Sequence, residues 1–332
     1  MAQTKTIAIA GAGSIGGYVG GLLSLGGHEV RMLARPAMVA RVAAGLHLSS
    51  HEGLDATVLP GQLQVSEDSA ILRGADIILV TVKSGGTADM AELIAAEAPQ
   101  GAVVISLQNG VGNADILREG LPGRDVRAGM VPFNVLQTED GRLHRGTSGD
   151  IMIEAGSGGI GGALSVPYLP VHESADMGSV LWGKLLLNLN NALNALSGLT
   201  LYEQLSDRDW RRLVAGQMDE ALRVLAAAGI TPAKATPLPP KMVPMILRLP
   251  TPVFRIVSGR MLKIDRMARS SMWEDLSRGR PTEIGVLQGA VEDLATQHGL
   301  TVPLISRVAE LIRAAEAKRA GSPGLSPDDV RG

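Results

Sequence analysis

The sequence predicts an α/β protein in which an N-terminal domain with a mostly parallel sheet is followed by an all-helical C-terminal domain. Short apolar runs alternate with helix-like stretches through the first half of the chain, whereas long helical patterns dominate after Trp182. Alternating strands and helices are typical of a parallel sheet with helices on both faces. The length of 332 residues also suits two domains better than one.

The first domain is expected over residues 1–176. Helical spacing between its apolar runs, for example over residues 88–98, predicts helices that cover the sheet. Residues 141–155 contain a hairpin-like pair that we expect to complete the same sheet. The predicted parallel strands are 6–10, 28–33, 76–82, 102–107 and 126–131.

The second domain is expected over residues 177–320. Seven prolines between Thr231 and Pro252 predict short helices and turns in that stretch. The polar, turn-rich residues 321–332 predict a disordered tail. The long helices predicted from periodicity are 181–196, 207–228, 261–276, 282–298 and 304–320.

Composition excludes several classes of function. Lys and Arg number 31 against 33 Asp and Glu, so no overall field favours nucleic acid or an anionic membrane. The chain has no cysteine, which excludes disulfides and thiolate catalysis, and His47 and His51 are the only histidines with ligand-like spacing, so no metal site is predicted. We expect a cytoplasmic protein that acts on a small molecule; a homodimer remains open.

A glycine-rich turn follows the first predicted strand. Gly-x-Gly-x-x-Gly after a strand and before a helix is typical of a dinucleotide-binding, Rossmann-type domain. The first glycine permits a tight turn, the second allows close approach of a pyrophosphate, and the third allows close packing of helix and strand. Backbone N–H groups at the helix start would then bind the anion. The residues are Gly11, Ala12, Gly13, Ser14, Ile15 and Gly16.

The end of the second predicted strand indicates the form of the nucleotide. An NAD site normally places Asp or Glu there to bind the ribose hydroxyls, but residues 30–36 contain no acid. Arg35 can instead pair with a 2′-phosphate, with Arg31 assisting, which favours NADPH/NADP. The alternative is a solvated arginine at a strand end.

Two further turns follow predicted strands at the edge where open α/β sheets bind ligands. Lys83 follows the strand at 76–82, and Asn109 follows the strand at 102–107. Both are candidates to border the cofactor or substrate. A solvated lysine and an ordinary Asn-Gly turn are the alternative interpretations.

The predicted helix 181–196 carries an unusual polar face. At about 100° per residue, Lys184, Asn188 and Asn191 fall within about 60° of one another, while the leucines gather opposite. Asparagine is a poor helix former, and a solvated face normally mixes charges of both signs. We therefore expect this face to hold a polar ligand, with Lys184 supplying charge or a proton.

A further group of polar residues lies between residues 270 and 284. Ser270 and Ser271 are candidates for ligand contacts or for helix caps, and Thr282 followed by Glu283 has the pattern of a helix start. The alternative for Glu283 is a carboxylate that faces the substrate.

Taken together, these residues resemble the ketopantoate reductases (2-dehydropantoate 2-reductases), and the resemblance covers nearly the whole chain. That family joins a Rossmann domain to a helical domain, places the active site in the cleft, and reduces ketopantoate to pantoate with NADPH. The motifs are Gly11 to Gly16, Arg35, Thr81-Val-Lys83, Gln108-Asn109-Gly110, Leu181-Trp-Gly-Lys184-Leu-x-x-Asn188, Ser270-Ser271-Met-x-x-Asp275 and Thr282-Glu283-Ile284.

The resemblance implies a role for each position. Lys184 would be the general acid, with Glu283 as its partner and as a contact of substrate and cofactor. Arg35 would contact the 2′-phosphate, and Lys83 and Asn109 would line the cofactor site. The implied substrate contacts are Asn109, Asn188, Asn191, Asn194 and Ser271. An ordinary lysine pKa, near ~10.4, would keep such an acid protonated at neutral pH.

The chain also departs from the family pattern. Ala192 stands where a second asparagine is typical, which leaves Asn191 or Asn194 as its substitute, and helical geometry favours Asn191. Ala268 and Gln108 replace an asparagine and a histidine of other members. We therefore expect reduction of ketopantoate, and keep open a reductase of another small 2-oxo acid and a catalytically idle NADP(H)-binding regulatory protein.

Overall fold

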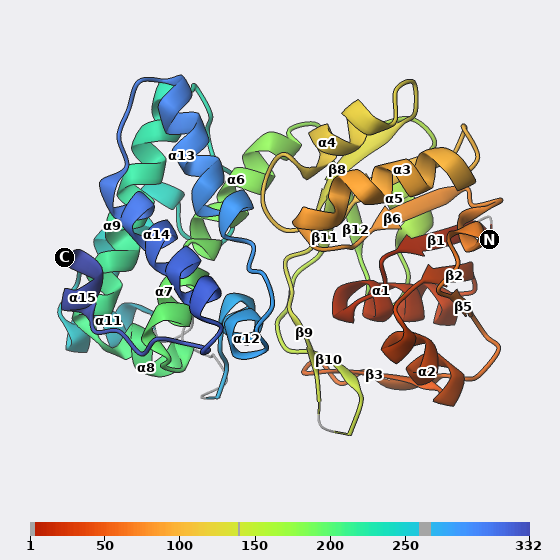
Figure 1. Ribbon diagram of the computed structural model, residues 1–332, viewed down its shortest axis with the longest axis horizontal. Coiled ribbons are helices and arrows are strands. Elements are labelled where there is room, and N and C mark those ends of the chain that lie inside the picture. The colour runs from red at the N-terminus through yellow and green to blue at the C-terminus, as the bar shows by residue number, and fades with distance from the viewer. Residues whose placement is uncertain (1–3, 139, 259–266) are drawn as a thin grey trace. The chain divides into compact units, whose positions relative to one another are not determined.

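The computed structural model describes residues 4–138, 140–258 and 267–332 and divides into two compact units. The first unit ends at Met177 and the second begins at Gly178, one residue beyond the predicted boundary (Figure 1). No helix in the described ranges is both long enough and apolar enough to cross a membrane.

A large, mostly parallel sheet forms the centre of the first unit, in the order β12-β11-β8-β7-β6-β1-β2-β5. Each neighbouring pair is parallel except β8 and β11, so the predicted parallel sheet is confirmed. The strands are β1 (Thr6–Ala10), β2 (Glu29–Leu33), β5 (Gln64–Ser66), β6 (Ile77–Val80), β7 (Val103–Ser106), β8 (Val126–Met130), β11 (Ile151–Glu154) and β12 (Val171–Ser174).

A smaller sheet has the order β4-β3-β10-β9, and it corrects the expectation for residues 141–155. Its strands β10 and β9 pair with each other, so β10 and β11 do not form the predicted hairpin, although β11 does extend the large sheet. Buried Arg145 donates to the carbonyls of Thr147, Gly149 and Tyr168, which holds the chain where it changes sheets. The strands are β3 (Leu46–Ser50), β4 (Asp55–Val58), β9 (Val135–Gln137) and β10 (Leu143–Arg145).

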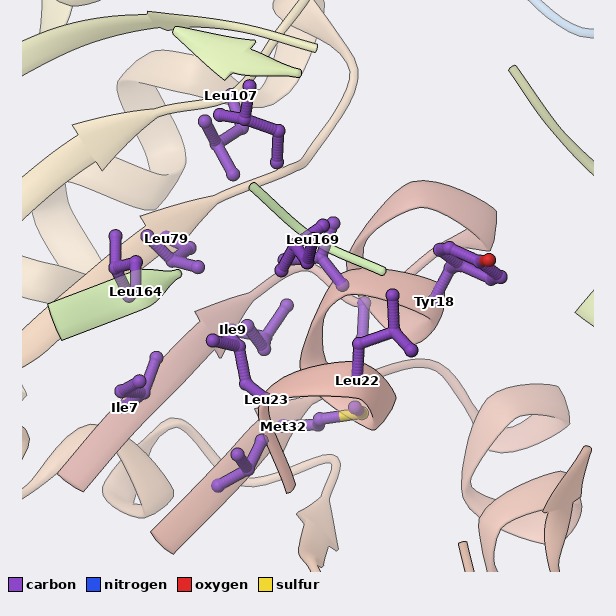
Figure 2. Close-up of a cluster of buried hydrophobic side chains, with 14 of the residues drawn as sticks. Ile7, Ile9, Tyr18, Leu22, Leu23, Met32, Leu79, Leu107, Leu164 and Leu169 are labelled. Carbon is purple, nitrogen blue, oxygen red and sulfur yellow. The ribbon is translucent and has the colours of Figure 1, made fainter. Parts of the chain in front are cut away.

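Helix α1 (Ser14–Leu25) lies between the two sheets (Figure 1). A Cβ on Gly20 would come within 2.8 Å of Ile9 in the large sheet, and a Cβ on Gly17 within 2.9 Å of Leu143 in the small sheet. Glycine on both faces therefore lets α1 pack closely against each sheet. Figure 2 shows Leu22 and Leu23 of α1 beside Ile9 of β1 in the resulting apolar core.

The other face of the large sheet is also buried. Ala8 and Ala10 of β1 point away from α1 and belong to a second apolar cluster, as expected from the alternation of side chains along a strand. Ile94 and Leu117 join this cluster from α3 and α4. The remaining helices of this unit are α2 (Pro36–Ala44), α3 (Thr87–Glu97), α4 (Asn113–Gly120) and α5 (Ile160–Leu164).

Within the described residues of the second unit, all regular elements are helices, as predicted. Its helices are α6 (Met177–Asn188), α7 (Asn190–Ser197), α8 (Leu201–Ser206), α9 (Arg208–Ala227), α10 (Val243–Leu247), α11 (Thr251–Ser258), α12 (Ser271–Ser277), α13 (Gln288–Gln297), α14 (Pro303–Lys318) and α15 (Pro327–Arg331).

Three helix predictions need correction. The predicted helix 181–196 is interrupted at Leu189, between α6 and α7. The helix predicted from residue 282 begins only at Gln288, after a 3₁₀ turn at Ile284–Val286. Of the predicted helix 261–276, residues 261–266 lie outside the described ranges, and α12 begins at Ser271.

The expected disordered tail is also wrong. Ser326 and Asp329 form a reciprocal capping box at the start of α15, and Val330 is completely buried. Capping satisfies backbone groups that would otherwise be exposed, and burial of an apolar side chain stabilises even a short helix. Composition alone pointed to fraying because it does not reveal this docking.

Candidate functional site

The glycine turn between β1 and α1 presents only some of its backbone N–H groups. Gly11 has φ +87° and lies against Val82, where a Cβ would collide with the valine side chain. The N–H groups of Gly11 and Ala12 both donate to the carbonyl of Leu33, at 3.1 and 2.8 Å. These two positions shape the turn and do not offer their N–H groups to an anion.

The start of α1 is the part of this turn that suits an anion. Gly13 is the N-cap and donates to Gly11, and Gly17 makes the first helical hydrogen bond back to Gly13 (2.8 Å). Among the described residues, no heavy atom lies within 4 Å of the position a Cβ on Gly13 would take, apart from its chain neighbours, so a ligand can approach there. The N–H groups of residues 14–16 precede that first helical bond, as in known anion sites.

Arg35 lies two residues after the end of β2 as the N-cap residue of α2, and it is exposed. It is therefore accessible to a phosphate. Arg31 instead bonds Glu29 at 2.5 Å and the carbonyl of Arg73. The suggested assistance of Arg31 is thus disfavoured, because its guanidinium is already engaged beside the strand.

Lys83 and Asn109 follow adjacent strands, β6 and β7; Lys83 is exposed and Asn109 is partly buried. Thr81 links the first of these turns to the glycine turn by donating its hydroxyl to the carbonyl of Gly11 (3.0 Å). The three predicted cofactor segments of the first unit therefore meet at one edge of its sheet.

A buried polar network lies beneath these turns. Gln108 donates to the Thr87 hydroxyl (2.7 Å), which in turn contacts the Ser84 carbonyl (2.8 Å) and the Asn113 amide oxygen (3.1 Å). Asn113 donates to the carbonyl of Asn109 (2.8 Å). Gln108 was expected as part of the Gln108-Asn109-Gly110 motif and as a departure from the usual histidine, whereas Thr87 and Asn113 were not expected to contribute. Their place at the starts of α3 and α4 was the available indication.

In the second unit, Lys184 and Asn188 lie one turn apart on α6, and both residues are partly buried. Burial lowers the pKa of Lys184 to about 8, while the nearby carboxylate of Glu283 acts in the opposite direction. The expected ordinary pKa is therefore wrong, because desolvation disfavours the ammonium. At pH 7 the protonated form still predominates, and its proton is more acidic than that of a solvated lysine.

Glu283 is the N-cap of a short 3₁₀ helix (Ile284–Val286), so a helix does start here as expected, but it is not α13 and the Glu283 side chain makes no capping hydrogen bond. Thr282 fixes this segment. Its hydroxyl accepts from Ile284 N–H (3.2 Å), and its own N–H donates to Glu316 of α14 (2.5 Å). The structure thus brings Lys184 and Glu283 into electrostatic interaction, as the family resemblance implied.

Asn194 does not have the geometry of a substrate contact. It is fully buried, and its amide group donates to the Leu199 carbonyl (3.0 Å) and the Gln204 side chain (3.2 Å). Its oxygen accepts from the N–H of Ser270 (2.8 Å). Burial and these three hydrogen bonds disfavour Asn194 as a substrate contact, whereas Asn191 remains partly exposed.

Ser270 and Ser271 have separate environments. Ser270 is buried and caps α12: its hydroxyl accepts from Trp273 N–H (3.1 Å) and donates to the Asn191 carbonyl (2.9 Å). Ser271 is the exposed first residue of α12. Of the two, Ser271 is the one available to a ligand.

Comparison with known proteins gives consistent matches along the chain. Residues 7–164 match the family model for ketopantoate reductase PanE/ApbA, and residues 176–316 match the model for its C-terminal part. A 2-dehydropantoate 2-reductase of Halobacterium salinarum is 28% identical over 320 residues, covering 93% of this chain and 98% of that protein.

Solved structures show the same fold. A PanE/ApbA family ketopantoate reductase from Ralstonia eutropha JMP134 superposes with a TM-score of 0.79 at 31% identity, covering 95% of this chain and 99% of that one. A D-mandelate dehydrogenase complex with NADH and anilino(oxo)acetate has a TM-score of 0.78 at 22% identity, with coverage of 95% and 99%. The second similarity concerns the fold alone.

Proposed function

The chain belongs to the ketopantoate reductase family, and from that premise we propose that it reduces 2-dehydropantoate to pantoate with NADPH. The observation that carries the proposal is the pairing of Lys184 with Glu283, in which burial lowers the pKa of Lys184 to about 8. A general acid works best when its pKa lies near the operating pH.

The first unit would bind the cofactor. The N–H groups at the start of α1 suit the pyrophosphate, and the exposed Arg35 suits the 2′-phosphate that distinguishes NADPH from NADH. When bound, NADPH supplies a hydride to the 2-oxo carbon of the substrate. Lys83 and Asn109, at the ends of neighbouring strands, would line the site.

The second unit would supply the proton and hold the substrate. Hydride addition leaves negative charge on the former carbonyl oxygen, and the Lys184 ammonium would stabilise this charge and donate its proton. Glu283 would keep Lys184 charged and oriented. Asn188 and Asn191 would donate amide hydrogens, and the Ser271 hydroxyl would contact the substrate carboxylate.

The decisive assay mixes purified protein, NADPH and ketopantoate and follows the loss of NADPH absorbance. We expect substrate-dependent oxidation that is much faster with NADPH than with NADH. Ketopantoate that is not turned over, while another 2-oxo acid is, would overturn the substrate assignment but leave the reaction class. Binding of NADPH without turnover of any 2-oxo acid would support the idle regulatory protein instead.

A second substrate class deserves a place in that assay. The D-mandelate dehydrogenase that shares this fold was solved with an aryl oxo acid analogue. In this chain, Asn194 is buried and engaged by Ser270, and Ala192 replaces the second asparagine of the family pattern, so the amides that reach a ligand are placed differently from those of typical members. Phenylglyoxylate is therefore the informative competitor of ketopantoate.

A further inference from the structure

The interruption between α6 and α7 is held by two buried glutamines. The backbone carbonyl of Leu189 accepts a hydrogen bond from the side-chain amide of Gln288 (3.0 Å) and one from that of Gln217 (3.4 Å). The Gln288 amide also donates to the side-chain oxygen of Gln217 (3.1 Å). Both glutamines are completely buried, so one polar contact joins the α6–α7 junction to α9 and α13.

Two buried glutamines at these positions stabilise the fold less than apolar side chains of similar size would. The side-chain oxygen of Gln288 is buried and has no hydrogen-bond partner within the described ranges. Burying an amide oxygen without a partner costs free energy, whereas an apolar side chain of similar size would avoid that cost. Gln217 likewise interrupts the apolar stripe of α9, between Leu213 and Ala221. Amides at these positions therefore provide directional contacts rather than additional stability.

The position of the junction suggests what those contacts achieve. Leu189 lies between Lys184 and Asn188 on one side and Asn191 on the other. Gln288 opens α13, immediately after the turn that carries Glu283. The hydrogen bond from Gln288 to Leu189 thus ties the segment that presents the carboxylate to the helix that presents the lysine.

We propose that Gln288, supported by Gln217, is a positioning residue that sets the geometry of Lys184 relative to Glu283 through the Leu189 carbonyl. The inference rests on the proposed function, in which Lys184 is the proton donor. Gln288 itself acts through the backbone. Its loss would let α13 shift against the α6–α7 junction and would move Glu283 away from Lys184.

Gln288→Met tests this, because methionine keeps the length of the side chain and removes the amide. We expect kcat for 2-oxo acid reduction to fall at least ten-fold, with NADPH binding unchanged within about two-fold. We also expect the pH above which reduction declines to move lower, because Glu283 would support the Lys184 ammonium less. Val308→Ala, a cavity variant in α14, serves as a stability control and should leave kcat and the pH profile unchanged.

A second measurement keeps the inference independent of turnover. The pKa of Lys184 can be obtained from the pH dependence of amine labelling at that residue, followed by peptide mass spectrometry. We expect a lower value in Gln288→Met than in the wild type. The same pKa and an unchanged kcat, accompanied by loss of thermal stability alone, would overturn the positioning role.

If Gln288→Met does not fold, Gln217→Met provides a second variant. It removes the longer hydrogen bond to the Leu189 carbonyl and should lower both kcat and the pKa of Lys184, each by a smaller amount. Unchanged readouts in folded Gln217→Met would then overturn the inference. A wild-type protein that turns over no 2-oxo acid would contradict the proposed function instead, and the labelling measurement would still decide the geometry.

Discussion

The side-chain oxygen of Asn194 accepts a hydrogen bond from the backbone N–H of Ser270 (2.8 Å), which attaches the start of α12 to α7. The same asparagine donates to Gln204, which also bonds Asn190 (3.0 Å). This buried contact determines where the exposed Ser271 lies relative to α7. Asn194 therefore has the geometry of a structural support for the proposed substrate-binding residues rather than of a substrate contact.

Comparison of Asn194→Ala with Asn191→Ala should distinguish the structural role expected of Asn194 from the direct substrate contact expected of Asn191. Asn194→Ala leaves buried polar groups without partners and should lower the free energy of unfolding by about 1–3 kcal/mol. Asn191→Ala alters a partly exposed side chain, so stability should change by about 0.5 kcal/mol or less, while KM for the 2-oxo acid rises. Urea denaturation and steady-state kinetics measure the two effects. A large stability loss in Asn191→Ala with unchanged KM would contradict the assignment.

Lys184→Ala should remove the proton donor without disturbing the cofactor site. General acid catalysis typically contributes about 10²- to 10⁴-fold, so kcat should fall by that factor. The dissociation constant for NADPH, measured by fluorescence titration, should stay within a few-fold of the wild-type value. Retention of full turnover would exclude Lys184 as the acid.

The rate of reduction should depend on pH through Lys184. Because burial lowers its pKa to about 8, the protonated acid predominates below pH 8 and is lost above it. Reduction should therefore decline above about pH 8, and oxidation of the 2-hydroxy acid should rise. Glu283→Gln removes the carboxylate that opposes the lowering of the Lys184 pKa, so the rate of reduction in this variant should begin to decline at a lower pH. A decline that starts at the same pH in both proteins would refute the pairing.

The same pKa has a consequence for folding stability. A lysine whose pKa is lower in the folded state releases its proton earlier there than in the unfolded state, so its contribution to stability rises between about pH 8 and the unfolded pKa of 10.5. Lys184→Met should flatten this part of the pH dependence of stability.

Arg35→Gln should change the choice of nucleotide. Removing a charged hydrogen-bond partner of the 2′-phosphate costs about 1.5–3 kcal/mol, which corresponds to a rise in KM for NADPH of about 10- to 100-fold. KM for NADH should change little, because NADH lacks that phosphate. Arg31→Gln is the matched control, since Arg31 is engaged by Glu29. Equal losses with both nucleotides would contradict the 2′-phosphate contact.

Thr87→Val tests the network beneath the cofactor turns. Valine keeps the shape but cannot bond Gln108, the Ser84 carbonyl or Asn113, so the turns at Lys83 and Asn109 should loosen. We expect the dissociation constant for NADPH to rise about ten-fold, in line with a hydrogen bond worth roughly 1 kcal/mol or more. Thr57→Val, at an exposed strand position, should leave it unchanged. Isothermal titration calorimetry distinguishes the two variants.

Local pattern was sufficient for much of the fold and for several site residues. The alternation of apolar runs predicted the parallel sheet, and the glycine spacing placed a tight turn at Gly11, which the positive φ confirms. The amide-rich face of the 181–196 region placed Lys184 and Asn188 together on α6. Such features depend on residues close in sequence, whose spacing directly reflects the period of a helix or strand.

Other features were decided only when distant segments packed together. Asn194 bonds Ser270 across 76 residues and Gln288 bonds Leu189 across 99, and neither partner is visible from local periodicity. Gln217 lies within an apolar stripe of α9 and was not recognised from the sequence, because local periodicity does not identify the distant groups that a buried amide contacts.

The sequence by itself determined the two-domain α/β and helical architecture, the glycine turn, and Lys184 with its neighbouring amides as the candidate site. Only the tertiary structure decided that Asn194 is structural, that Glu283 precedes a 3₁₀ turn, and that burial lowers the pKa of Lys184 to about 8. The physical reason is that a side chain's exposure, hydrogen-bond partners and proton affinity depend on the groups packed around it, many of which come from other parts of the chain.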